Sequence, residues 1–320
     1  MDDLLRLING YQLSQAIHVA ATLGIADRLA GGARDAEDLA VATDAHAPAL
    51  YRLLRALAAV GILHEDADHR FALTPLGEGL RTDVPDSAAG WAAFIGRPYH
   101  WSAWSQLLHS VRTGENAFAA VHGVDVWTYR AEHPEESGIF DAAMTALAAR
   151  VTASVLAAYD FGQFEVVADI GGSRGTLLAA ILAHHPHLRG ILFDRPGVVA
   201  GVDLGERCRI VGGSFFEAVP GGADAYILKS VLHDWDDETS VAILQSIRRA
   251  APAGSAVLIL ERRLGPPNAE PAGKLSDLNM LVATGGRERT RDEYARLLEA
   301  AGYGLVSETP AGPVSVFEAR

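Results

Sequence analysis

After Phe164 the sequence changes from a helical pattern to a strand-like one. Six short runs there are rich in β-branched and other apolar residues: EVVADI, GILFD, CRIVGG, AYILKSVL, SAVLILE and VSVFEAR. The first five are separated by helical or loop stretches. Strands that alternate with helices predict a mostly parallel sheet that is covered on both faces. The chain is therefore expected to contain an α/β unit that binds its ligand at the carboxyl ends of the strands.

The preceding part of the chain, from Leu4 to about Ala158, is predicted to be helical. LLRLINGYQLSQAIHVAATLGIADRL keeps apolar residues three and four positions apart, and APALYRLLRALAAVGIL has Pro48 near its first turn and stops at Gly61. The following segment ILHEDADHRFALT is typical of a short hairpin with a polar turn. Three helices and a hairpin suggest a winged helix.

Charge argues against DNA as the partner of this winged helix. Residues 1–90 contain 13 Asp or Glu but only 7 Arg and no Lys, and the whole chain has a formal net charge of -13. A duplex or an anionic membrane would be repelled. The helical domain is expected instead to pack against a second copy of itself or against the other domain.

The remaining composition points to a reducing compartment. Cys208 is the only cysteine, which excludes an intrachain disulfide and a zinc cluster of cysteines. The N-terminus lacks the basic start and apolar core of a secretory signal, and no run approaches the roughly 18 apolar residues of a membrane helix. We expect a cytoplasmic protein.

The loop in VVADIGGSRGTLL, Val166 to Leu178, allows several interpretations. Gly171–Gly175 fits the G-x-S-x-G pattern of a hydrolase nucleophile, and Ser173, Asp194 and His233 stand in the order of a catalytic triad. A hydrolase elbow, however, needs several strands before it, and here the preceding chain is helical. A dinucleotide G-x-G-x-x-G pattern fails because Ser173 and Thr176 stand where glycines are needed.

A nucleoside site fits the loop better. A strand ending at Asp169, a glycine-rich turn and a helix that starts near Thr176 would let a ligand approach the backbone closely. Asp194 ends the next strand, nineteen positions beyond Gly175, where a carboxylate accepts hydrogen bonds from both ribose hydroxyls. The ligand need not carry a phosphate.

A longer segment is more specific than the glycine spacing. GGSFFEAVPGGADAYILKSVLHDWDDE, Gly212 to Glu238, together with DIGGSRG, FDRPGVV and GGRERT, resembles the S-adenosylmethionine-dependent small-molecule O-methyltransferases. This type includes plant phenylpropanoid and flavonoid enzymes, hydroxyindole O-methyltransferase and bacterial enzymes that tailor aromatic natural products. The resemblance covers essentially the whole chain.

The resemblance implies an α/β fold with a Rossmann-like parallel sheet that binds S-adenosylmethionine (SAM) and ends in a C-terminal antiparallel strand. A winged-helix-like dimerisation domain would occupy residues 1–95, connecting helices that contribute to the substrate pocket residues 96–158, and the methyltransferase domain residues 159–320. A homodimer is implied.

The resemblance also implies a cofactor site. Its residues would be Asp169, Gly171, Gly172, Ser173, Gly175, Asp194, Arg195, Ser214, Phe215, Phe216 and Lys229. Phe215 would lie against the adenine ring. Two positions depart from the family pattern: many relatives have Asp where this chain has Ser214, and Ser173 replaces the middle glycine of the loop.

For catalysis, the resemblance implies that His233 is the general base. Glu261 and Glu288 would flank its imidazole, and Asp234 is a neighbour with a less clear role. No metal is expected, because the consecutive acids of HDWDD fit a helix start better than a ligand set. Substrate contacts would come from Phe140, Met144, Asn279, Met280 and Trp101, with Trp104 as a further candidate. Ordinary core packing is the alternative for each of these side chains, since helical aromatics are commonly buried.

The expected reaction is methyl transfer from SAM to a hydroxyl, preferably a phenol, of an aromatic small molecule in antibiotic or other natural-product biosynthesis, with S-adenosylhomocysteine (SAH) as product. The alternatives left open are methylation of nitrogen or carbon and a relative with altered chemistry, such as a decarboxylase, hydroxylase or pericyclase. A non-enzymatic winged-helix regulator is a more remote alternative.

Overall fold

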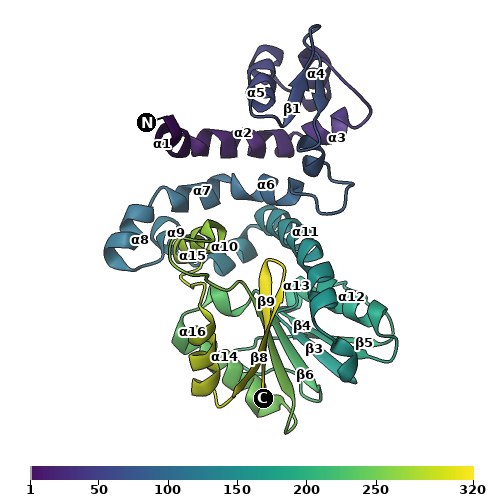
Figure 1. The fold of residues 1–320 in the computed structure, drawn as a ribbon, viewed down its shortest axis with the longest axis vertical. Coiled ribbons are helices and arrows are strands. Elements are labelled where there is room, and N and C mark those ends of the chain that lie inside the picture. The colour runs from purple at the N-terminus through teal and green to yellow at the C-terminus, as the bar shows by residue number, and fades with distance from the viewer. Residues whose placement is uncertain (1) are drawn as a thin grey trace. The chain divides into compact units, whose positions relative to one another are not determined.

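The computed structural model describes residues 2–320 and divides them into two compact units. One unit comprises the chain up to Ser102 together with Arg130–Leu147, and the other comprises Ala103–Tyr129 together with Ala148–Arg320. Figure 1 shows the helices and strands of each unit.

The first unit is mainly helical, as the apolar spacing predicts. It begins with α1 (Asp2–Ile8), α2 (Gly10–Thr22), α3 (Ile25–Leu29), α4 (Ala36–Thr43) and α5 (Ala47–Ala59), followed by the hairpin β1 (Leu63–Glu65) and β2 (Phe71–Leu73), η1 (Gly77–Leu80) and α6 (Ala89–Ile95). The strands pair antiparallel, which confirms the predicted hairpin. The long helical stretch after Leu4 is broken before α3, where Gly24 has a left-handed φ of 61°. Leu39, Leu54 and Phe71 are fully buried at the centre of this unit's core.

Short helices and one long helix connect this region to the sheet. They are α7 (Pro98–Trp104), α8 (Leu107–Thr113), α9 (Ala117–His122), α10 (Val126–Glu132) and α11 (Pro134–Ala158), followed by η2 (Phe161–Gln163). Among residues 2–320, α11 is the one helix that is long and apolar enough to cross a membrane by length and composition. The sequence was not expected to contain such a helix because Asp141 and polar residues such as Thr145 interrupt the apolar run of α11. One such helix is weak evidence, since core helices pass the same test.

The second unit contains a seven-stranded sheet in the order β5-β4-β3-β6-β7-β9-β8. Its strands are β3 (Val166–Ile170), β4 (Arg189–Asp194), β5 (Cys208–Gly212), β6 (Ala225–Lys229), β7 (Ala256–Glu261), β8 (Leu305–Ala311) and β9 (Val314–Ala319). The first five are parallel to one another, which confirms the predicted α/β sheet. Its other helical elements are α12 (Thr176–His184), α13 (Pro196–Val199), η3 (Leu232–Asp234), α14 (Asp237–Ala250), α15 (Pro271–Ala283) and α16 (Arg291–Ala300).

The end of the sheet confirms the expected C-terminal antiparallel strand and adds one strand that was not predicted. The confirmed strand is β9, which pairs antiparallel with β7, and the additional strand is β8, which pairs antiparallel with β9. The strand β8 was missed because it lies at the sheet edge, is largely half-buried, and carries Ser307, Glu308 and Pro310. A polar sequence with a proline is tolerated at an edge, where one side of the strand has no partner.

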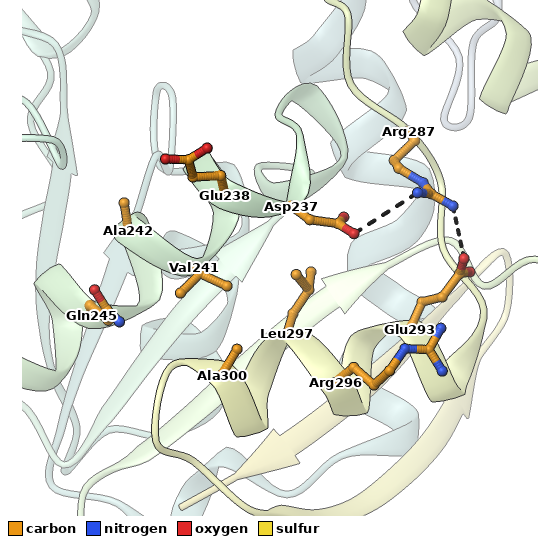
Figure 2. Close-up of a pocket in the computed structure, with 10 residues that line it drawn as sticks. All are labelled: Asp237, Glu238, Val241, Ala242, Gln245, Arg287, Glu293, Arg296, Leu297 and Ala300. Atoms are coloured by element: carbon orange, nitrogen blue, oxygen red, sulfur yellow. Dashed lines mark hydrogen bonds and ion pairs between the residues drawn. The ribbon is translucent and has the colours of Figure 1, made fainter.

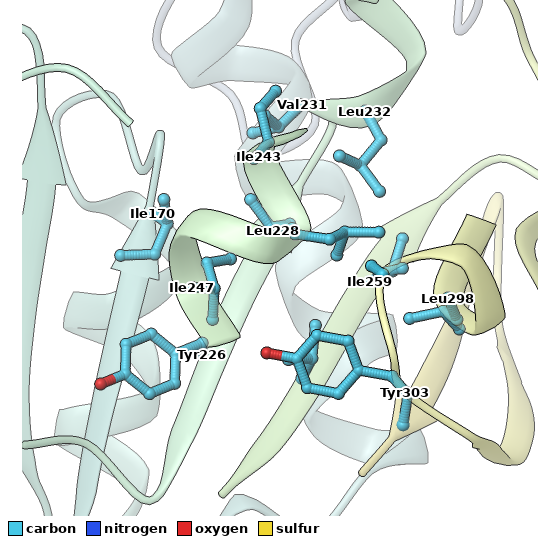
Figure 3. Packing of buried hydrophobic residues seen from close by; sticks show 14 of the residues in the cluster. Ile170, Tyr226, Leu228, Val231, Leu232, Ile243, Ile247, Ile259, Leu298 and Tyr303 are labelled. Atoms are coloured by element: carbon cyan, nitrogen blue, oxygen red, sulfur yellow. The ribbon is translucent and has the colours of Figure 1, made fainter. Parts of the chain in front are cut away.

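Side chains of the parallel strands point alternately to two buried layers. Tyr226 and Leu228 of β6 pack in one cluster with α14 and α16, while Ala225 and Ile227 pack in another with α12. Figure 3 shows the first cluster, in which Leu228 lies near Ile259 and Ile243. Burial on both faces fixes the register of these strands, because a shift by one residue would exchange the two sets of side chains. The carboxyl ends of β3, β4, β6 and β7 are thereby held along one edge of the sheet.

Candidate active site

The glycine loop follows β3 at this edge and takes a backbone conformation that few residues adopt. Gly171 and Ser173 both have left-handed φ values, 71° and 54°. A Cβ on Gly172 would lie 2.6 Å from the Asp169 carboxylate, so a larger residue does not fit there. Ser173 is held in its strained conformation by its N–H, which donates to Asp194 Oδ2 at 2.8 Å. The predicted helix start near Thr176 is confirmed by α12.

Asp169 lies under this loop with its carboxylate almost completely buried. Neither of its oxygens has a hydrogen-bond partner within residues 2–320. Burial raises the pKa of Asp169 to about 7, although the positive charge of Lys229 partly counteracts this shift. A buried carboxylate without a donor is unfavourable. The α-ammonium group of a methionine moiety would satisfy it, so the residues at this loop fit SAM.

Asp194 and a group of aromatic rings lie along the same edge. Asp194 Oδ1 accepts the N–H of Arg195 at 2.7 Å, and burial raises the pKa of the Asp194 carboxyl. An ionised carboxylate has about four acceptor positions, so Asp194 can still accept the hydroxyls of a ribose. Phe216 is half exposed and meets Trp235 edge to face, with ring centroids 4.9 Å apart.

Other predicted cofactor residues lie beside this group. Phe215 contacts the Phe216 ring at a centroid distance of 4.7 Å, and the Ser214 hydroxyl accepts the Phe216 N–H at 3.3 Å. The Arg195 guanidinium lies 5.5 Å from the centre of the Trp127 ring, which is in turn stacked 6.4 Å from Trp235. Neither Trp127 nor Trp235 was among the predicted cofactor residues. The tryptophan inside HDWDD was the available signal for Trp235.

His233 lies on η3, where the chain leaves β6 in a tight turn. The predicted strand AYILKSVL ends early, at Lys229, because the backbone N–H groups of Val231 and Leu232 both donate to Glu261 Oε1 at 2.9 Å. Glu261 ends the neighbouring strand β7 and is fully buried. One carboxylate oxygen thus shapes the turn, and the other is left for the imidazole.

Two glutamates face the same nitrogen of the imidazole. His233 Nδ1 lies 3.2 Å from Glu261 Oε2 and 3.5 Å from Glu288 Oε1. The Ser276 hydroxyl of α15 also donates to Glu288 Oε1, at 2.7 Å. Nε2 faces the other way, 3.8 Å from Asp234 Oδ1. The structure therefore brings together all four predicted catalytic side chains.

Electrostatics favour a charged imidazole in this arrangement. Burial alone would lower the pKa of His233, but the carboxylates of Glu261, Asp234 and Glu288 outweigh it and raise that pKa to about 10. Burial raises the pKa of Glu261 to about 7, while for Glu288 the hydrogen bond and charge of His233 outweigh burial and lower the pKa. A general base has to be neutral before it acts, so the predicted role of His233 requires that its imidazole first lose a proton.

The same side chains meet a distance criterion for a metal ion. One ligand atom from each of His233, Glu261 and Glu288 lies within 4.8 Å of the others. The contacts already described account for this geometry, since the carboxylates hold the imidazole, the turn and Ser276. The expectation that catalysis needs no metal stays a prediction.

The predicted substrate residues fall in both units. Asn279 and Met280 lie on α15, where the Asn279 side-chain oxygen accepts the Trp104 indole N–H at 3.0 Å and Met280 is buried. Phe140 lies in the first unit, with the Arg130 guanidinium 3.4 Å from its ring centre. Met144 and Trp101 are half-buried in that same unit. A role of these five side chains in binding an acceptor stays a prediction.

A surface groove between α14 and α16 contains none of the predicted site residues. It is lined by Asp237, Glu238, Val241, Ala242, Gln245, Arg287, Glu293, Arg296, Leu297 and Ala300. Figure 2 shows Arg287 between two carboxylates, 3.9 Å from Asp237 and 2.8 Å from Glu293. Arg287, which forms both pairs, directly precedes Glu288 in the sequence.

Comparison with known proteins identifies the family of this chain. Residues 104–304 match the O-methyltransferase domain, and residues 5–83 match the O-methyltransferase dimerisation domain. The chain belongs to this O-methyltransferase family. The enzyme uses SAM as its methyl donor, as the family does, and the domain match indicates a homodimer.

Three relatives illustrate the range of the family. The phenazine O-methyltransferase of Lysobacter antibioticus is 44% identical over 99% of this chain and 95% of its own. A crystal structure of an O-methyltransferase from neocarzinostatin biosynthesis, in complex with SAM and 2-hydroxy-5-methyl naphthoic acid, is 36% identical with a TM-score of 0.84 over 96% of this chain and 95% of that one. The aclacinomycin 10-hydroxylase of Streptomyces purpurascens is 35% identical over 99% of this chain and 88% of its own. A relative that is 35% identical to this chain is therefore named for a different reaction.

Proposed function

We propose that the enzyme methylates a phenolic hydroxyl of an aromatic natural product, with His233 as the general base. The observation that carries this proposal is the arrangement of His233, whose Nδ1 is engaged by two buried glutamates. The neutral ring would keep its proton on Nδ1, where the carboxylates accept it. Nε2 is then the nitrogen available to take a proton from the acceptor.

The cofactor would lie along the edge formed by the glycine loop, Asp169 and Asp194. When bound, SAM supplies an electrophilic methyl group on a good leaving group. The tasks left for the protein are to align the acceptor oxygen and to remove its proton. Alignment can contribute about 7–11 kcal/mol to lowering the barrier, and a positioned base about 10²–10⁴ in rate.

The raised basicity of His233 bears on the second task. A phenol has a pKa of about 10 and an ordinary imidazole one of about 6.5, so proton transfer between them is unfavourable by about 5 kcal/mol. With a pKa of about 10 for His233, this gap largely disappears. The cost is that only a small part of the ligand-free enzyme holds a neutral imidazole at pH 7. The positive sulfonium of SAM disfavours a charged imidazole nearby, so bound SAM would increase the fraction of enzyme with a neutral His233.

Asn279 and Met280 are proposed to contact the acceptor, while a role of Phe140, Met144 and Trp101 stays a prediction. Support for Asn279 comes from its hydrogen bond to Trp104, which orients the amide on the same helix as Ser276. Support for a flat aromatic acceptor comes from the naphthoic acid bound to the neocarzinostatin relative. The division into domains at residues 95 and 158, and the cytoplasmic location, stay predictions.

The dimer is proposed to form through α1 and α2. These two helices expose a row of large apolar side chains: Leu4, Leu5, Leu7, Ile8, Tyr11, Leu13 and Val19. They overlap the region that matches the dimerisation domain. An exposed apolar surface of this kind is typical of a protein interface.

The test is a screen of phenolic natural products with SAM, read by mass spectrometry as the gain of one methyl group. The wild-type enzyme should methylate at least one phenol. His233→Ala should lower kcat by about 10²–10⁴ while SAH binding, measured by calorimetry, stays within about threefold. Full turnover by His233→Ala would refute the role of the base.

The hydroxylase relative supports one second candidate, a SAM-dependent reaction without methyl transfer. Retention of the imidazole with its two glutamates favours methylation. Conversion of a phenol to a product without an added methyl would favour the alternative, and a methyl found on nitrogen or carbon would correct the acceptor atom. Tight binding of a DNA duplex would revive the regulator hypothesis.

A further inference from the structure

We propose that Arg289 is a positioning residue for the general base, because its guanidinium fixes the turn that presents the His233 imidazole. The inference rests on the proposed role of His233. Arg289 directly follows Glu288, and its side chain is fully buried. Arg289 is not among the predicted site residues and takes no part in the proton transfer proposed for His233.

The guanidinium donates to carbonyl groups on both sides of His233. Nη1 donates to Leu232 O at 2.8 Å, just before the histidine, and Nη2 donates to Trp235 O at 2.8 Å, two residues after it. Nε and Nη2 also donate to Asp237 Oδ1, at 2.9 and 2.8 Å. The turn from Leu232 to Trp235 is therefore held at both ends by one rigid group.

The contacts to the two carbonyl groups depend on the planar shape of the arginine guanidinium. Its five N–H donors lie in a fixed fork, whereas a lysine ammonium offers three donors from a single point. One ammonium cannot reach the carbonyls of both Leu232 and Trp235 with the same geometry. A buried charge with a single carboxylate partner is costly unless its remaining N–H groups are satisfied, and here carbonyl oxygens satisfy them.

The backbone around Arg289 holds the turn from a second side. Arg287 N–H donates to His233 O at 2.9 Å. A Cβ on Gly286 would lie 2.0 Å from the same His233 oxygen, so the two segments are in direct contact. The Arg289 backbone also bridges to Arg263, two residues beyond Glu261.

These contacts link Arg289 to both glutamates of the site. Glu288 precedes it in the chain, and Glu261 lies at the end of the strand that leads to the Arg263 bridge. A displacement of the turn would therefore move Nε2 relative to the acceptor. Misplacement of a reacting group by about 1 Å can cost about 10²-fold in rate.

The experiment compares Arg289→Lys, Gly286→Ala and the control Arg248→Lys with the wild-type enzyme, using a phenol that the wild type methylates. Arg248 lies in the last turn of α14, with its guanidinium 5.0 Å from the centre of the Tyr303 ring. We expect kcat to fall about 10²-fold in Arg289→Lys and to fall also in Gly286→Ala, where the added methyl group displaces the His233 carbonyl. KM for the phenol and the SAH dissociation constant should stay within about threefold, and Arg248→Lys should match the wild type.

The outcomes separate this inference from the proposed function. A wild-type enzyme that binds SAH but methylates nothing would contradict the proposed function. An active wild type, with a folded Arg289→Lys that keeps kcat within about twofold, would overturn the positioning role. A parallel loss of kcat and SAH affinity would also overturn it, because it would indicate a general structural role. If Arg289→Lys does not fold, a folded Gly286→Ala that keeps kcat within about twofold would overturn the proposal, because its added methyl group must displace the same turn.

Discussion

The ionisation of His233, the proposed general base, is unusual. The structure surrounds the imidazole with three carboxylates, which favour its charged form, whereas a general base has to be neutral before it acts. Both conditions are met if the imidazole loses its proton when the cationic cofactor binds.

The first prediction concerns the pKa of His233 with each form of the cofactor. SAM and SAH differ in the sulfonium charge and the methyl group, so SAM should lower the pKa of His233 further below about 10 than SAH does. The measurement is a pH titration of the imidazole Hε1 resonance by NMR, assigned by its absence in His233→Asn. Equal pKa values with SAM and SAH would contradict the electrostatic argument.

The same ionisation sets the direction of two pH dependences. At saturating SAM, kcat/KM for the phenol should rise with pH as the imidazole loses its proton. For stability the sign is opposite. Folding raises the pKa of His233 from 6.5 to about 10, so its stabilising contribution is fully present below pH 6.5 and is lost as the pH rises toward 10.

The second prediction concerns metal ions. Dialysis against EDTA should leave methyl transfer unchanged, because one oxygen of each glutamate already accepts hydrogen bonds, Glu261 Oε1 from the turn and Glu288 Oε1 from Ser276. Activity before and after dialysis, together with metal analysis of the protein, checks this. A lasting loss of activity that magnesium restores would show that an ion belongs to the site.

At the scale of the element, α14 begins directly after the His233 turn and depends on its cap. The Asp236 side chain accepts the Thr239 N–H at 2.8 Å, which confirms the helix start expected from HDWDD. Asp237 is the first helical residue and binds Arg289 instead of capping. Asp236→Ala should reduce the free energy of unfolding by about 0.5–2 kcal/mol. Urea unfolding measures this, and Asp236→Asn, which keeps an acceptor oxygen, should lose much less.

Most helices and strands could be predicted from the sequence, because the spacing of apolar residues reflects which side chains are buried. The runs that became β3, β4, β6 and β7 are buried on both faces, and such strands are apolar throughout. The edge strand β8 has no such pattern. The glycine loop, Asp194 and the strand ends followed from the order of strand, turn and helix, whereas the two glutamates came from family resemblance.

Other site residues could not be predicted, since their partners are backbone atoms or distant in the sequence. Arg289 binds mainly to carbonyl oxygens of the His233 turn, which leave no trace in side-chain identity. Ser276 meets Glu288 only because α15 packs beside that segment. Trp127 meets Trp235 across more than a hundred residues of chain.

At the scale of the whole molecule, the proposed dimer can be separated from monomer folding. Leu7 is 71% exposed on α1 and Val41 is 87% exposed on α4, so either can be replaced by Asp with little effect on the monomer. Leu7→Asp should weaken the dimer strongly because the charge would lose water at the interface. Light scattering across a dilution series checks this. Dissociation by Val41→Asp with no effect of Leu7→Asp would place the interface elsewhere.

The position of β9 has a consequence for how the enzyme is made. This strand is inserted between β7 and β8, and its Ser315 pairs with Glu261, the carboxylate that shapes the His233 turn. During translation, the ribosome must therefore release the chain through about Ala319 before β7 gains its second neighbour. A nascent chain stalled earlier would hold the complete cofactor loop, yet β7, which carries Glu261, would be paired along one side only.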